Sequence, residues 1–271
     1  VRTFDFGLVA ATSFAVNWVA GIHSILNGMT EKYYDFTGML CYMSCITISA
    51  YAAFETQGQL HIRQWVNSAL VILWTGRLGT FLFARILRDL KEEKRNPNIF
   101  DDLREHPLRF MGAWTVQGLW VLLVALPVFV LNTIPDQPPL KLQDVIGWGM
   151  WTVGFLCEAF ADSQKAAFRK NPENKGRYIT TGLWSWSQHP NYFGEILLWC
   201  GMVVTCASAS NCWAHALTLL SPLFTAFLLL KVTGIPQMQK AGDERWGHEA
   251  GYQTYRKETS LLVPVPPKKT K

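Results

Sequence analysis

The segment GLWSWSQHPNYFGE, residues 182–195, gathers polar side chains at the point where an apolar run begins. Pro190 predicts the first turn of a helix, because the N–H that proline lacks would have no partner in that turn. His189 then lies just before the helix, and Asn191 and Glu195 lie four residues apart on one of its faces. Polar side chains are costly where a membrane helix begins, so the segment predicts a site that holds a polar ligand. The alternative is a capped helix end with a solvated rim.

A second set of charged side chains comes about twenty residues earlier in the chain. Its four members follow one another at offsets of 0, 4, 7 and 11, which keeps them within a narrow arc of one helix: Glu158, Asp162, Lys165 and Arg169. They could form a ladder of ion pairs, each worth a few tenths of a kcal/mol. They could instead line a cavity in which Lys165 and Arg169 contact phosphate. The polar cluster in the neighbouring segment favours the cavity.

The composition indicates a membrane protein. Charged residues make up 17% of the 271 residues, and 12 residues are Trp. A soluble domain has about 25% charged residues, and Trp collects at bilayer interfaces. Seven windows approach or reach the roughly 20 apolar residues that cross a bilayer: 6–27, 37–54, 64–87, 111–131, 142–163, 192–208 and 213–231. We therefore predict an all-α, polytopic membrane helical bundle of about seven transmembrane helices, forming a single domain over residues 1–271.

The distribution of Lys and Arg predicts the topology. Basic residues gather in the connections 88–110 and 164–190 and in the C-terminal tail, whereas 132–141 and 209–212 contain only Lys141. Seven spans put the three basic regions on one side, as the positive-inside rule expects, and the N-terminus on the other. Topology thus explains the net charge of +5. The basic connections also carry acidic residues and no interleaved aromatic stripe, so we expect no nucleic-acid partner.

Other motifs are absent from the sequence. The six cysteines and six histidines form no CxxC, HExxH or Cys/His spacing, so neither a metal site nor a disulfide framework is predicted. No GxGxxG occurs, which leaves no Rossmann site for a dinucleotide. The last residues, 264–271, are rich in Pro and Lys, and we expect this tail to lie outside the bundle against an anionic surface.

Residues 158–201 resemble the C-terminal region of the steroid 5α-reductase-like membrane proteins, in the branch known as a domain of unknown function. The HPNYFGE string and the AD-x-Q-K helix carry this resemblance. A more distant resemblance is to isoprenylcysteine carboxyl methyltransferases, which have a similar HPxY turn and use S-adenosylmethionine. The resemblance covers about residues 60–265 and includes four further segments: 72–85, 114–132, 233–240 and 252–264.

The resemblance implies a helical bundle that binds NADPH from the cytosolic side. It implies hydride delivery to the β-carbon of an enone in a lipid or sterol-like substrate, in the endoplasmic reticulum or another organelle membrane such as the mitochondrial inner membrane. The catalytic acid is not assigned. The implied cofactor-binding residues are Asp162, Lys165, Arg169, Arg177, His189, Asn191, Tyr192, Glu195, Tyr255 and Arg256.

Three positions depart from the family's usual pattern. Gln188 stands where an arginine is usual, Gln239 where an acidic residue is usual, and Glu258 where a basic residue is usual. Two of these changes remove positive charge near a phosphate site, and one lost charge-assisted contact costs about 1.5–3 kcal/mol. The alternative function is therefore a non-catalytic membrane subunit that keeps the reductase fold and packs against other membrane subunits. A lipid methyltransferase that uses S-adenosylmethionine is the third hypothesis.

Overall fold

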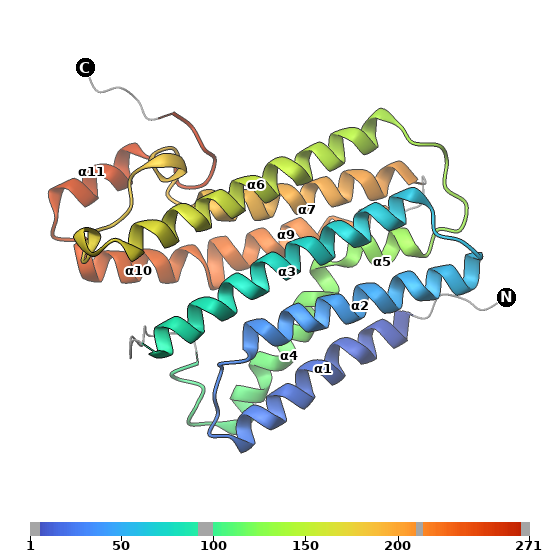
Figure 1. Cartoon of the computed structure of the whole chain (residues 1–271), viewed down its shortest axis with the longest axis horizontal. Helices are drawn as coiled ribbons and strands as arrows, with labels where there is room; N and C mark the ends of the chain where they lie inside the picture. Colours follow the sequence, from blue (N-terminus) through green and yellow to red (C-terminus); the bar gives the residue numbers. More distant parts are fainter. Residues whose placement is uncertain (1–5, 92–99, 210–213, 267–271) are drawn as a thin grey trace. The chain divides into compact units, whose positions relative to one another are not determined.

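The computed structural model describes residues 6–91, 100–209 and 214–266, and within these ranges the chain is helical with no strand (Figure 1). The predicted all-α membrane bundle is confirmed. Two compact units share the chain: unit 1 contains Val1–Pro139 and Ala209–Thr218, and unit 2 contains Leu140–Ser208 and Leu219–Lys271. The single domain over 1–271 stays a prediction. Parts of the predicted connections 88–110 and 209–212, of the span 213–231 and of the tail 264–271 lie outside the described residues.

The described part of unit 1 contains the long helices α1 (Phe6–Leu26), α2 (Tyr34–Gln57), α3 (Ile62–Lys91) and α4 (Pro107–Val124), and the short helices α5 (Leu126–Asn132) and α8 (Ala214–Thr218). Helix α1 packs against α4 and α2, and α2 packs against α3. Tyr42 of α2 fills the space between these helices, because its ring meets Trp74 at 5.4 Å and Trp120 at 5.0 Å, edge to face in both cases. Aromatic pairs in this geometry add stability beyond the area that they bury.

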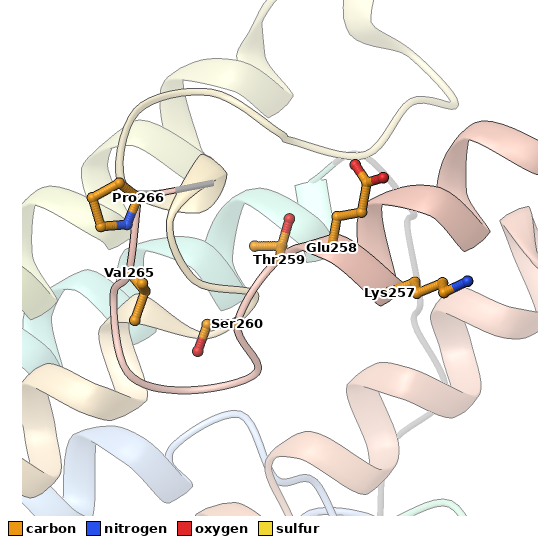
Figure 2. Close-up of a pocket in the computed structure, with 6 residues that line it drawn as sticks. All are labelled: Lys257, Glu258, Thr259, Ser260, Val265 and Pro266. Carbon is orange, nitrogen blue, oxygen red and sulfur yellow. The ribbon is translucent and has the colours of Figure 1, made fainter. Parts of the chain in front are cut away.

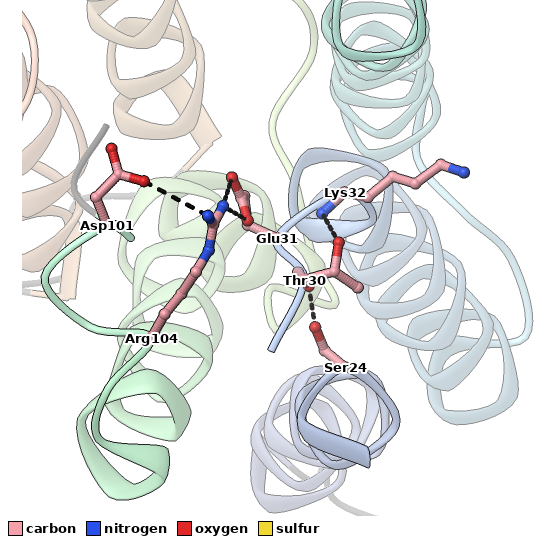
Figure 3. Close-up of polar contacts among 6 residues, drawn as sticks. All are labelled: Ser24, Thr30, Glu31, Lys32, Asp101 and Arg104. Carbon is pink, nitrogen blue, oxygen red and sulfur yellow. Dashed lines mark hydrogen bonds and ion pairs between the residues drawn. The ribbon is translucent and has the colours of Figure 1, made fainter. Parts of the chain in front are cut away.

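Polar contacts at the two ends of unit 1 show that its successive helices run in opposite directions. At one end, Arg104 forms ion pairs with Glu31 and with Asp101, whose carboxylate lies 3.5 Å from the guanidinium (Figure 3). At the other end, Arg63 donates to the carbonyl oxygen of Pro139 at 2.8 Å. The first contact joins the α1–α2 and α3–α4 connections, and the second joins the start of α3 to the chain after α5. Successive connections therefore lie at opposite ends, as in a bundle that crosses a membrane repeatedly.

Unit 2 contains two long helices and a shorter C-terminal series: α6 (Leu142–Lys170), α7 (Pro190–Ala209), α9 (Leu220–Phe227), the π-helical turn η3 (Leu228–Val232), α10 (Ile235–Trp246) and α11 (Ala250–Glu258). Two 3₁₀ turns lie between α6 and α7: η1 (Pro172–Asn174) and η2 (Gly182–Ser185). The proline at position 190 begins α7, as the sequence predicted.

Glycines hold the antiparallel helices α6 and α7 close together. A Cβ atom on Gly154 would lie 2.5 Å from the carbonyl oxygen of Gly194, and one on Gly201 would lie 2.4 Å from that of Gly147. The two glycines of each helix are seven residues apart, so both pairs fall on one seam. Small residues on such a seam let two membrane helices approach backbone to backbone. The seam fixes the C-terminal half of α6 beside the start of α7.

The described residues contain five or six candidate membrane-crossing helices, where the sequence predicted about seven. Among the described residues, five helical segments are long and apolar enough, and the α4–α5 pair, bent by 53°, would make a sixth. The five are Phe6–Leu26, Tyr34–Gln57, Ile62–Lys91, Pro190–Ala209 and His215–Trp246. The predicted span 142–163 is helical as part of α6, but three carboxylates, Asp144, Glu158 and Asp162, and several glycines make it less apolar.

Candidate functional site

The loop before α7 is fastened to the end of α6. Gly182 has φ +63, a conformation that favours glycine, and a Cβ there would lie 2.5 Å from the side chain of Gln164. Beyond the glycine, the N–H of Leu183 donates to Gln164 Oε1 at 2.9 Å, and Trp184 Nε1–H donates to the carbonyl of Ala161 at 3.0 Å. These bonds bring the HPN turn back onto the helix that carries the second polar cluster.

Asp162 and Asn191 meet at the junction of α6 and α7. The Asn191 amide donates from Nδ2 to Asp162 Oδ1 at 3.2 Å, and Asp162 is 9% exposed. The other polar atom of the amide, Asn191 Oδ1, is buried and accepts no hydrogen bond from any residue that the structure describes. A buried acceptor without a partner costs about 1–3 kcal/mol. This atom is therefore available to a donor from a ligand, such as a hydroxyl or an amide N–H.

His189 stacks on Tyr192 beside this pair. Their rings are 5.2 Å apart and nearly parallel, with an interplanar angle of 3°. His189 is only 7% exposed, and burial, followed by the charges of Lys165 and Arg256, lowers the pKa of its imidazole to about 3. The imidazole is therefore neutral at physiological pH. It can offer a hydrogen bond at the site without adding charge.

The cations of the site differ in their surroundings. Lys165 is half-buried, and its ammonium lies 4.5 Å from the centre of the Trp184 ring in a cation–π contact. Arg169 at the end of α6 and Arg177 in the following loop are exposed. Glu195, one turn below the start of α7, is half-buried. The charged stripe of α6 thus runs from a buried end toward an exposed rim.

Tyr255 and Arg256 reach the same loop from α11. The Tyr255 hydroxyl donates to the carbonyl of Trp184 at 2.7 Å, and burial raises the pKa of this phenol. The guanidinium of Arg256 pairs with Asp243 on α10. The Tyr255 side chain thus binds the loop before α7, and the Arg256 side chain binds the neighbouring helix α10.

Gln188 has a role that sequence reasoning missed. Its side-chain amide donates to the carbonyls of Arg256 at 3.0 Å and Thr259 at 2.8 Å. Both of its N–H groups are therefore used by the C-terminal segment. No spacing signal could have revealed this pairing, because the partners lie about seventy residues away and are backbone atoms. Unlike Gln188, the other two departures lie far from Asp162 and Asn191 in sequence: Gln239 is half-buried on α10, and Glu258 ends α11.

A cavity of 240 Å³ lies in the C-terminal segment. Figure 2 shows its lining residues, which all come from the end of the described chain: Lys257, Glu258, Thr259, Ser260, Val265 and Pro266. None of the ten predicted cofactor residues lines it. No pattern in the sequence indicated this cavity.

The polar groups at the α6–α7 junction are of kinds that could hold a nucleotide. Asn191 Oδ1 can accept from a ribose hydroxyl or a carboxamide, and the Asp162 carboxylate holds the Asn191 amide in place. Exposed guanidinium groups at Arg169 and Arg177 suit phosphate, which arginine binds with paired N–H donors. The described residues thus include a buried hydrogen-bond acceptor at Asn191 and exposed cations at Arg169 and Arg177.

Comparison with known proteins places the chain among steroid-reductase-like sequences. Residues 26–259 match the family model described as "Protein of unknown function (DUF1295)". Over 118 residues the chain is 26% identical to 3-oxo-5-alpha-steroid 4-dehydrogenase 1 of Bos taurus and 27% identical to that of Rattus norvegicus. Each match covers 44% of this chain and 40% of the relative.

A shorter similarity joins the chain to a methyltransferase. Over 46 residues the chain is 41% identical to "Probable O-methyltransferase ustE" of Ustilaginoidea virens. This match covers 17% of this chain and 16% of that relative. No solved structure matches the chain.

Proposed function

Because the chain belongs to the DUF1295 family of steroid 5α-reductase-like membrane proteins, we propose that it is an NADPH-dependent reductase of a carbon–carbon double bond in a lipid or sterol-like substrate. Two relatives are named as dehydrogenases of a 3-oxo-5α-steroid, which supports an oxidoreductase. The observation that carries the proposal is the Asp162–Asn191 pair, with its buried acceptor that no described residue uses.

The proposed nucleotide site divides into an inner and an outer part. In the inner part, Asp162 orients the amide of Asn191 so that Oδ1 accepts from the nucleotide, while the His189–Tyr192 stack forms a neutral wall. In the outer part, Arg169 and Arg177 neutralise phosphate. Lys165, Glu195, Tyr255 and Arg256 complete the proposed set.

When bound, NADPH supplies the hydride that the β-carbon of an enone receives. The chain's own residues bind and orient, and the depressed pKa of His189 keeps one wall of the site uncharged. A neutral, buried wall strengthens the remaining electrostatic contacts, because less water screens them. The substrate is proposed to enter from the bilayer of an organelle membrane, with the endoplasmic reticulum supported by the resemblance to steroid reductases.

Two other functions give different outcomes in one experiment. The similarity to a probable O-methyltransferase favours S-adenosylmethionine as ligand, and a non-catalytic subunit needs neither ligand. Purified protein in detergent is titrated with each ligand while its unfolding temperature is recorded. For NADPH at a hundredfold excess over its Kd we expect a stabilisation of about 2.7 kcal/mol. A shift with S-adenosylmethionine alone would indicate the methyltransferase. A folded protein that responds to neither ligand would indicate the subunit.

A further inference from the structure

We propose that Gln188 is a positioning residue that fastens the C-terminal segment Thr259–Val265, called the strap, over the turn that carries His189 and Asn191. The proposal rests on the proposed nucleotide site, because it states how that site is kept in shape. In this role Gln188 holds the turn in position by hydrogen bonds and does not bind phosphate.

The side chain of Gln188 completes the end of α11. The last carbonyls of a helix have no partner within it and need donors from elsewhere. Gln188 Nε2 supplies them, at 3.0 Å from the Arg256 carbonyl and 2.8 Å from that of Thr259, and the backbone N–H of Gln188 donates to the Ser260 carbonyl at 2.8 Å. Three bonds from one residue thus hold the junction of α11 and the strap. An amide has two N–H groups, and both are used here.

Ser187 couples the strap to the site directly. Its hydroxyl donates to the Leu262 carbonyl at 2.7 Å and accepts from the backbone N–H of His189 at 3.0 Å, and Ser187 is fully buried. Farther along the strap, the N–H of Val265 donates to the Trp186 carbonyl at 3.0 Å. A displacement of the strap would therefore remove the acceptor of the Ser187 hydroxyl, whose oxygen in turn accepts from the His189 N–H.

The loop that connects α6 to α7 is held by α6 on one side and by the C-terminal segment on the other. On the inner side, Leu183 and Trp184 bond to α6, and Asn191 bonds to Asp162. On the outer side, the loop is held by Gln188, Ser187 and Tyr255. Because these hydrogen bonds hold the outer side of the turn that carries Asn191, release of the strap would loosen the orientation of its buried acceptor.

The test replaces Gln188 by residues that differ in hydrogen-bond donors. Gln188→Glu keeps the shape but puts a carboxylate against two carbonyls, whereas Gln188→Arg restores donors. Gln253→Glu is the matched control, since Gln253 Nε2 also donates to a backbone carbonyl, that of Gly247 at 2.8 Å, on an exposed face of unit 2. Hydrogen exchange of the Gln188 and Val265 amides reports on the strap, and the Kd for NADPH reports on the site.

We expect Gln188→Glu to speed exchange of both reporter amides about tenfold or more and to raise the Kd for NADPH about tenfold, because several linked hydrogen bonds are lost. Gln188→Arg should restore slow exchange, and Gln253→Glu should change neither measurement. If Gln188→Glu does not fold, Ser187→Ala replaces it, with faster exchange at Val265 as the expected result.

Three outcomes would overturn part of the account, and they differ. Unchanged exchange in Gln188→Glu would show that the amide does not hold the strap. Faster exchange with an unchanged Kd would show that the strap does not position the site. A wild-type protein with slow exchange but no affinity for NADPH would refute the proposed function, and the exchange data would still decide whether Gln188 holds the strap.

Discussion

The amide of Asn191 at the start of α7 donates to the carboxylate of Asp162 in α6 across 3.2 Å. The glycine seam sets this distance, because Gly154 and Gly194 bring the two backbones together one or two turns away. The bond leaves Asn191 Oδ1 buried and facing no described partner. A rigid pair of helices thus holds a polar group that a ligand can complete.

Replacing Asn191 by Ala should weaken NADPH binding about tenfold to a hundredfold, because two hydrogen bonds of about 0.5–1.5 kcal/mol each depend on this amide. The Kd for NADPH, measured by isothermal titration calorimetry in detergent, checks this. Asn174→Ala is the control, since Asn174 also uses Nδ2 to bond a carbonyl, that of Phe168 at 3.0 Å. Equal Kd values for wild type and Asn191→Ala would remove Asn191 from the site.

Replacing Gly154 by Ala should destabilise unit 2 by about 1–3 kcal/mol, because the new Cβ overlaps the Gly194 carbonyl and forces α6 and α7 apart. In Gly149→Ala, on the same helix, the Cβ meets nothing within 4 Å, so the better helix propensity of Ala should stabilise by up to about 1 kcal/mol. Thermal unfolding in detergent distinguishes the two variants. A Gly154→Ala protein as stable as Gly149→Ala would show that the seam is not tightly packed.

The depressed pKa of His189 predicts how stability changes with pH. In the folded chain the imidazole stays neutral down to about pH 3, whereas in the unfolded chain it gains a proton near the ordinary histidine pKa of 6.5. The unfolded state therefore binds more protons between these values. The free energy of unfolding should fall as pH is lowered from 6.5 toward 3, with a slope approaching ~1.4 kcal/mol per pH unit from this residue.

His189→Gln should flatten this part of the stability profile, measured by chemical denaturation at several pH values. His248→Gln, which changes an exposed imidazole on the same unit, should leave the slope as in the wild type. Identical slopes in all three proteins would contradict the burial of a neutral imidazole at position 189.

The topology can be tested by labelling. Helix α6 has 29 residues and is about 43 Å long at 1.5 Å per residue, more than the roughly 30 Å of the hydrocarbon core. Single cysteines at Gln137 and Lys175, in a background without other cysteines, should react with an impermeant maleimide from opposite faces of the membrane. Reaction from the same face would show that α6 does not cross.

Several features of the fold followed from local patterns. The apolar windows predicted α1, α2 and α3, and Pro190 predicted the start of α7. The window 111–131 did not reveal its break, although Pro127 lies inside it. Proline removes a backbone donor and clashes with the preceding turn, and the chain here bends by 53° between α4 and α5.

The candidate site could be predicted only in part. Helical spacing put Asp162 on the charged face of α6, and the polar turn drew attention to Asn191. The family resemblance then implied that both residues bind the same cofactor. Their contact depends on the seam of glycines, which single-residue patterns do not report. Gln188 was interpreted as a lost phosphate contact, yet its amide binds the Arg256 and Thr259 carbonyls. A neutral side chain that bonds distant backbone atoms leaves no periodic signal in a sequence.

The most direct test of the proposed reductase is hydride transfer itself. The protein in lipid nanodiscs is incubated with NADPH that carries deuterium at the transferred position and with a 3-oxo-4-ene steroid or an enone lipid, and the products are analysed by mass spectrometry. We predict a product that has gained one deuterium on the carbon β to the carbonyl and one proton from water, and that is lost in Asn191→Ala. If a folded protein that binds NADPH transfers deuterium to none of the enones offered, the account is contradicted.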